Sequence, residues 1–66
     1  MTQGAAYRLA GKVAAKHRTF IYVVWSPEED DIPGEHYQYG GDVACDTFFQ
    51  GAPVVACFGP DGTLQD

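Results

Sequence analysis

The stretch Thr-Phe-Ile-Tyr-Val-Val-Trp-Ser, residues 19–26, is a short apolar run between polar neighbours. Six of its eight residues are aromatic or aliphatic, and Ile21, Val23 and Val24 are β-branched. This composition over so short a length predicts a buried β-strand rather than a helix. The stretch also divides the charge of the chain, because all four Lys and Arg residues precede it and all nine Asp and Glu residues follow it.

Both faces of this predicted central strand are apolar. Since side chains alternate along a strand, one face carries Ile21, Val23 and Trp25, and the other carries Phe20, Tyr22 and Val24. One helix can cover one face, and the other face must meet a second element or a second copy of the chain. A chain of 66 residues buries only about 60% of its unfolded surface. Pairing of two copies would strengthen this marginal core, so we predict a homodimer.

The residues before the strand predict a helix over 4–17. Its apolar side chains recur with the spacing of one helical face: Ala6, Leu9, Ala10, Val13 and Ala14. Arg8, Lys12 and Lys16 are spaced by four and form a basic stripe on another face. Thr2 is a suitable N-cap. Gly4 and Gly11 disfavour the helix, and a strand remains the alternative.

The residues after the strand predict short elements separated by turns. Strands are expected at His36–Tyr39, Val54–Phe58 and Thr63–Gln65, with a tight turn at Gly59–Gly62. Residues 42–51 are ambiguous: a short helix that begins at Asp42 is favoured over a strand paired with 53–58. The fold class is therefore α+β, in a single domain over residues 1–66. It has a small antiparallel sheet of three or four strands, an N-terminal helix and, in the favoured interpretation, a second short helix.

Acidic residues crowd the segment that follows the predicted central strand. Such a run is usually a solvated loop, and calcium is disfavoured because the alternating Asp spacing and central Gly of an EF-hand are absent. The functional interpretation is a docking surface, since a field of one sign steers a basic partner. Carboxylates can also occupy a Lys/Arg groove that normally takes phosphates. With two nearby tyrosines, a residue type enriched at interfaces, the predicted partner-binding residues are Glu28, Glu29, Asp30, Asp31, Glu35, Tyr37, Tyr39, Asp42 and Asp46.

Two cysteines and two histidines raise the question of a zinc site. Cys45, Cys57, His17 and His36 show neither the C-x-x-C nor the H-x-x-x-H spacing of familiar zinc motifs. A disulfide needs an oxidising compartment, which nothing else in the sequence indicates. We therefore expect no metal and no cofactor, with both cysteines free and packed as small hydrophobic groups.

Signals of catalysis, nucleic-acid binding and membrane insertion are weak. Ser26 is the only serine and lies in no nucleophile motif. A catalytic Cys45–His36 dyad is not excluded, but any small protein with one Cys and one His would pass the same test. The net charge of −5 disfavours direct binding of nucleic acid. No apolar run is long enough to cross a membrane, and no signal-peptide pattern is visible. We expect a non-enzymatic protein of the cytoplasm.

In character the chain resembles small phage-encoded inhibitors, including some anti-CRISPR proteins, which are tiny, acidic, poor in cysteine and without a catalytic signature. The resemblance covers the whole chain but depends on size and charge rather than on a motif, so no residue role is carried over. It implies an inhibitor in the host cytoplasm that mimics nucleic acid and blocks the basic surface of a nucleic-acid-binding partner. Two alternatives remain: an assembly module that acts through an apolar sheet face, and a small Cys/His metal-binding domain.

Overall fold

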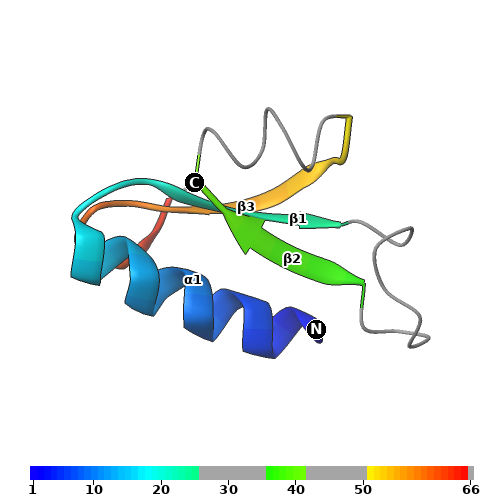
Figure 1. The fold of residues 1–66 in the computed structure, drawn as a ribbon, viewed down its shortest axis with the longest axis horizontal. Coiled ribbons are helices and arrows are strands. Elements are labelled where there is room, and N and C mark those ends of the chain that lie inside the picture. The colour runs from blue at the N-terminus through cyan, green and yellow to red at the C-terminus, as the bar shows by residue number, and fades with distance from the viewer. Residues whose placement is uncertain (26–35, 42–50, 66) are drawn as a thin grey trace.

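The computed structural model describes residues 1–25, 36–41 and 51–65, so the prediction for 42–50 lies outside the described residues. Its elements are the helix α1 (Gln3–His17) and the strands β1 (Ile21–Trp25), β2 (Tyr37–Gly40), β3 (Val54–Phe58) and β4 (Leu64–Gln65). Figure 1 shows α1 lying across one face of the sheet. The predicted α+β fold with an N-terminal helix is confirmed.

The sheet has four strands within the described residues, in the order β2-β1-β3-β4, and each neighbouring pair is antiparallel. The predicted central strand is confirmed, because β1 pairs with β2 on one side and with β3 on the other. Val23 lies opposite Tyr39 and Ala56. The next residue, Val24, lies opposite Val54, so Val55 is an extra residue that forms a bulge in β3.

Helix α1 is well terminated at both ends, which offsets the cost of its two glycines. The Thr2 hydroxyl accepts a hydrogen bond from Ala5 N at 3.2 Å. At the other end Arg18 adopts the left-handed conformation with φ 53°, and its backbone N–H donates to Ala14 O. Lys16 and His17 lie in the last turn, where positive charge complements the helix dipole. Capping at each end explains why the helical interpretation was correct despite the glycines.

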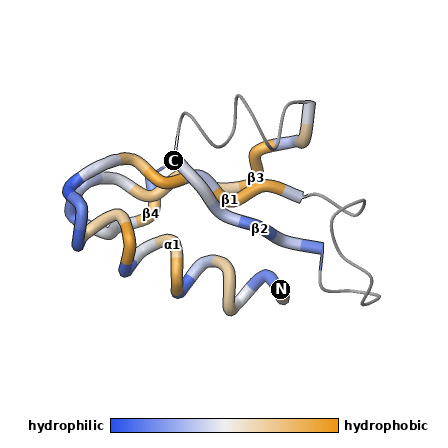
Figure 2. Tube along the Cα trace, in the orientation of Figure 1, coloured by the Kyte–Doolittle hydropathy of each residue, from blue (hydrophilic) through white to orange (hydrophobic). Residues whose placement is uncertain are grey.

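The core lies between α1 and one face of the sheet. Its buried members are Ala6, Ala10, Ala14, Ile21, Val23 and Phe58. The alanines lie at a spacing of four, and their small side chains allow the helix to approach the strands closely. Figure 2 shows that the apolar residues concentrate along β1 and β3. The predicted apolar helix face is therefore correct at its three alanines, whereas Leu9 and Val13 are only partly buried.

The face of the sheet turned away from α1 is partly closed within one chain. Val24 is fully buried, Tyr22 is half-buried and Phe20 is exposed. A second copy of the chain is therefore not needed to cover the middle of this face. Among the described residues, the exposed large apolar side chains lie at or beside the ends of strands: Phe20, Trp25, Val54, Val55 and Leu64.

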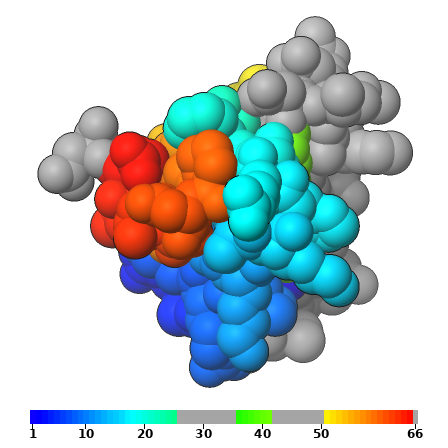
Figure 3. Space-filling view, turned by 90° about the vertical axis from the view of Figure 1, so that its left-hand side faces the viewer, coloured from blue at the N-terminus to red at the C-terminus, as the bar shows by residue number. Residues whose placement is uncertain are grey.

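The predicted turn between β3 and β4 is confirmed. Gly62 N donates to Gly59 O at 2.8 Å, and Gly59 N donates to Thr63 O at 2.9 Å. Gly62 has φ +84°, a conformation that favours glycine. Figure 3 shows the turn and β4 (orange and red) lying against α1 (blue).

Candidate functional site

Only two of the nine predicted partner-binding residues, Tyr37 and Tyr39, belong to the part of the chain that the structure describes; the seven acidic ones lie outside it. Both tyrosines are half-buried on β2 and pack against the core. Their cross-strand partners are Trp25 and Val23, so their side chains share the sheet face that α1 covers. The two rings therefore support the core, and only their exposed portions are available to a partner.

One end of the sheet carries exposed apolar side chains that the sequence analysis did not select. Trp25 is 42% exposed at the end of β1, and Val54 and Val55 are 55% and 42% exposed at the start of β3. The two strands are joined here, because Trp25 N donates to Pro53 O at 3.0 Å. We call these three exposed side chains the apolar sheet end. The sequence signal for the apolar sheet end is Trp25, a bulky residue at the last position of the strand, just before Ser26-Pro27.

The acidic segment is attached to this same end of the sheet. The chain leaves β1 at Trp25 and returns to the sheet at Tyr37, and these two residues face each other across the strands. Residues 26–35, which carry five of the nine carboxylates, are therefore connected to the apolar sheet end on both sides. The topology thus links an acidic segment to exposed apolar side chains.

His36 lies beside Trp25 at this end. The two rings meet edge to face, with centroids 6.4 Å apart and an interplanar angle of 82°. His36 Nδ1 is buried and has no hydrogen-bond partner among the described residues. The His36 imidazole therefore packs beside the Trp25 indole ring.

The basic residues lie on or directly after α1. Arg8, Lys12, Lys16 and Arg18 are all exposed. Within residues 1–25, 36–41 and 51–65 none of them makes an ion pair. Their charges are therefore available to solvent or to a ligand on the helix surface.

The candidate metal ligands do not gather in the described part of the chain. His17 ends α1 near the start of β1, whereas His36 precedes β2 near the end of β1. Cys57 is a free, half-buried cysteine on β3, and Cys45 lies outside the described residues. No cluster of three or more potential metal ligands occurs among the described residues. The placement of the two histidines gives the metal-binding alternative no support.

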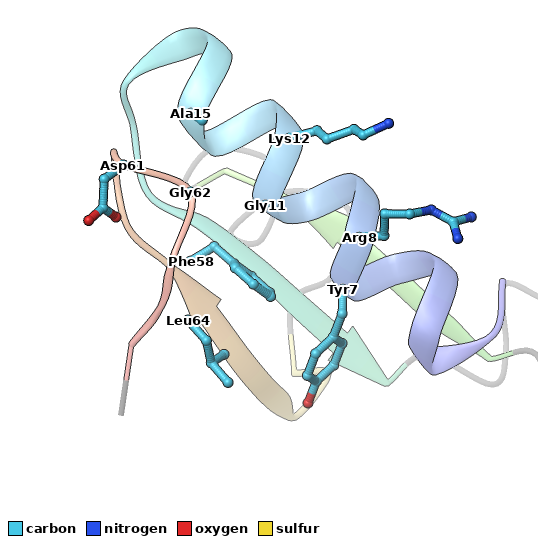
Figure 4. Close-up of a pocket in the computed structure, with 9 residues that line it drawn as sticks. All are labelled: Tyr7, Arg8, Gly11, Lys12, Ala15, Phe58, Asp61, Gly62 and Leu64. Atoms are coloured by element: carbon cyan, nitrogen blue, oxygen red, sulfur yellow. The ribbon is translucent and has the colours of Figure 1, made fainter.

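A shallow hollow of about 560 Å³ opens between α1 and the β3–β4 hairpin. Figure 4 shows the side chains of Tyr7, Phe58 and Leu64 converging on it. Arg8 and Lys12 line its helical side, and Asp61 lies at the turn. No local sequence pattern predicts this hollow, because it forms between elements that are distant in the sequence.

Asp61 is held in place by its own turn. Its Oδ1 accepts from the Thr63 hydroxyl at 2.7 Å and from Thr63 N at 3.1 Å. The hydrogen bond from the Thr63 side chain, and then that from the Thr63 backbone, lower the pKa of the Asp61 carboxyl below its ordinary value. Asp61 therefore stays ionised at neutral pH and fixes a negative charge at the turn.

Comparison of the chain with known protein families, curated proteins and solved structures found no match. Among the described residues, no helix has the length and apolar character needed to span a membrane. The functional interpretation therefore depends on the side chains and their arrangement.

Proposed function

We propose that this chain is a non-enzymatic inhibitor that binds a partner protein and blocks its basic, nucleic-acid-binding surface, in the manner of phage-encoded anti-CRISPR proteins that mimic nucleic acid. The observation that supports this best is the exposure of Trp25, Val54 and Val55 where the acidic segment 26–35 is attached. A protein interface commonly has an apolar centre within a charged or polar rim. Trp25 would supply the anchor, and the carboxylates would pair with the partner's Lys and Arg residues.

The lining of the hollow offers no positive signal of covalent catalysis. Its lining contains no Cys, Ser or His, and its one carboxylate, Asp61, is occupied by Thr63. A nucleophile with an adjacent base is the usual minimum for covalent catalysis. The described residues do not supply that pair at this place.

Self-association is the second part of the proposal. In the absence of a partner, the apolar sheet end is the surface through which two copies would pair, because burial of these side chains stabilises a dimer. The alternative function, an assembly module that acts through an apolar face, would use the same surface. The two functions differ in their dependence on salt, since charge mimicry weakens as ionic strength rises and apolar assembly does not.

The test is a pull-down from host lysate at low and high salt, with nucleic acid added as a competitor. The triple variant E28Q/E29Q/D30N removes three charges from the acidic segment and changes the net charge from −5 to −2. The matched control Q3K/H17K/T19K reaches the same net charge on the exposed surface of α1 and its C-terminal turn. We expect the first variant to lose a captured nucleic-acid-binding protein, and the control to retain it.

Two results contradict the proposal. Equal loss in both triple variants shows that only the overall charge matters. Capture that is unchanged by salt and by E28Q/E29Q/D30N, but abolished by Trp25→Ser, supports the assembly module instead.

A further inference from the structure

We propose that the hollow between α1 and the β3–β4 hairpin is a second binding site, and that it takes an acidic peptide segment with one bulky apolar side chain. This site is separate from the apolar sheet end and does not depend on the function proposed above. Three features support it: an apolar floor, two cations on the helix rim that make no ion pair with a described residue, and a fixed anion at one end.

The floor exists because α1 leaves β4 uncovered. The helix packs through its buried alanines on Ile21 and Val23 of β1, and Tyr37 and Tyr39 of β2 pack against the same core. The turn after β3 contacts α1 at Gly11, so the hairpin is held beside the helix. Leu64 remains 51% exposed. Phe58 meets Tyr7 edge to face, with centroids 5.7 Å apart, so two of the three floor side chains are aromatic rings in contact.

The rim of the hollow is polarised. Arg8 and Lys12 are four residues apart on α1 and contribute to the lining, and their charged ends extend into solvent on the side of the helix away from Phe58 and Leu64 (Figure 4). Neither makes an ion pair within the described residues. Asp61, whose carboxylate is fixed by Thr63, lies at the turn. A ligand therefore gains most if its carboxylates face α1 and its neutral part faces the turn.

The shape of the hollow favours a peptide over a small molecule. Small ligands bury most of their surface in enclosed pockets, whereas this hollow is open along the protein surface. Its floor of Tyr7, Phe58 and Leu64 has room for one bulky apolar side chain, and the flanking backbone of a peptide can lie outside. A phosphate chain would gain the same two cations, but it would leave the apolar floor uncovered.

The test is an NMR titration of the ¹⁵N-labelled chain with the blocked pentapeptide Glu-Glu-Phe-Glu-Glu. We expect the amide signals of Gly11, Phe58 and Leu64 to shift. Replacing the four glutamates by glutamines should weaken binding about fivefold to tenfold, because surface ion pairs each contribute little but act together. Replacing the phenylalanine by alanine should abolish measurable shifts.

Lys12 and Lys16 give a matched pair of variants on the same helix, because Lys12 lines the hollow and Lys16 does not. Lys12→Glu should weaken the peptide about tenfold through lost attraction and new repulsion, and Lys16→Glu by less than about twofold at physiological salt. A dispersed spectrum for each variant establishes that it is folded.

Three outcomes overturn the proposal. They are shifts confined to Trp25 and Val54, equal binding of the alanine peptide, and equal loss in the two lysine variants. Shifts at Gly11 and Leu64 with phosphatidylglycerol vesicles, but not with the peptide, would assign the hollow to lipid and also refute it.

Discussion

Gly11 of α1 and Gly62 of the β3–β4 turn meet backbone to backbone. A Cβ atom on Gly11 would lie 3.1 Å from Gly62 O, and one on Gly62 would lie 2.9 Å from Gly11 O. The sequence indicated each glycine separately, one as a weak point in a helix and the other as the exit of a turn. In the structure they form a single contact that holds the C-terminal hairpin against the helix.

Gly62→Ala should destabilise the chain by about 2–4 kcal/mol. Its φ of +84° is strained for alanine, and the new Cβ would also lie 2.9 Å from Ala15 Cβ. Gly51 has the same φ but no atom within 4 Å of such a Cβ, so Gly51→Ala should cost only about 1 kcal/mol. Urea unfolding measures both variants, and equal losses would show that the contact between turn and helix contributes nothing.

Gly4→Ala and Gly11→Ala form a second matched pair within α1. Gly4 has open space around it, so alanine there should stabilise the chain by up to about 1 kcal/mol through helix propensity. At Gly11 the same gain is offset, because the new Cβ must displace the Gly62 carbonyl. We expect the melting temperature to rise by at most about 4–8 °C for Gly4→Ala and to change little for Gly11→Ala. A similar rise in both variants would contradict the close approach.

The order of the described elements could be predicted because the local signals agreed. The apolar run of 19–26, the cap at Thr2 and the turn at 59–62 each specify one conformation, and each prediction is confirmed. The bulge at Val55 could not be predicted, since the extra residue is defined only by the pairing of β3 with β1.

The candidate sites were harder to predict, because they depend on which side chains the fold leaves uncovered. Periodicity placed Trp25 on a core-facing side of the strand, but its position at the strand end leaves it exposed. The hollow joins Tyr7 to Phe58 and Leu64, which are about as distant in the sequence as the chain allows. No local sequence pattern predicts that these three side chains lie together. The acidic set remains a prediction from the sequence.

The stability of the chain should fall as pH drops through the pKa of Asp61 in the folded state. The hydrogen bonds from Thr63 lower that pKa, so the carboxylate stabilises the fold at pH values above its unfolded pKa and loses this effect in acid. Thr63→Val removes the hydroxyl donor but keeps the backbone donor. We expect a carbon-detected NMR titration to show the Asp61 pKa rising toward its ordinary value in the variant. An unchanged pKa would mean that the hydroxyl is not the main cause.

Trp25 should control a homodimer that forms when no partner is present. Burial of a large apolar side chain contributes about 1.5–3 kcal/mol, so Trp25→Ser should raise the dimer dissociation constant more than about tenfold. Phe20 is a matched control, because it is also an exposed aromatic residue but lies just before the other end of β1. Phe20→Ser should leave the dimer intact.

Sedimentation across protein concentration and salt measures this equilibrium. Two chains of net charge −5 repel each other, so the dimer should strengthen as salt rises. A wild-type monomer at high micromolar concentration and moderate salt would refute the dimer and leave the apolar sheet end to the partner alone. Loss of the dimer in Phe20→Ser but not in Trp25→Ser would instead move the interface to the other end of β1.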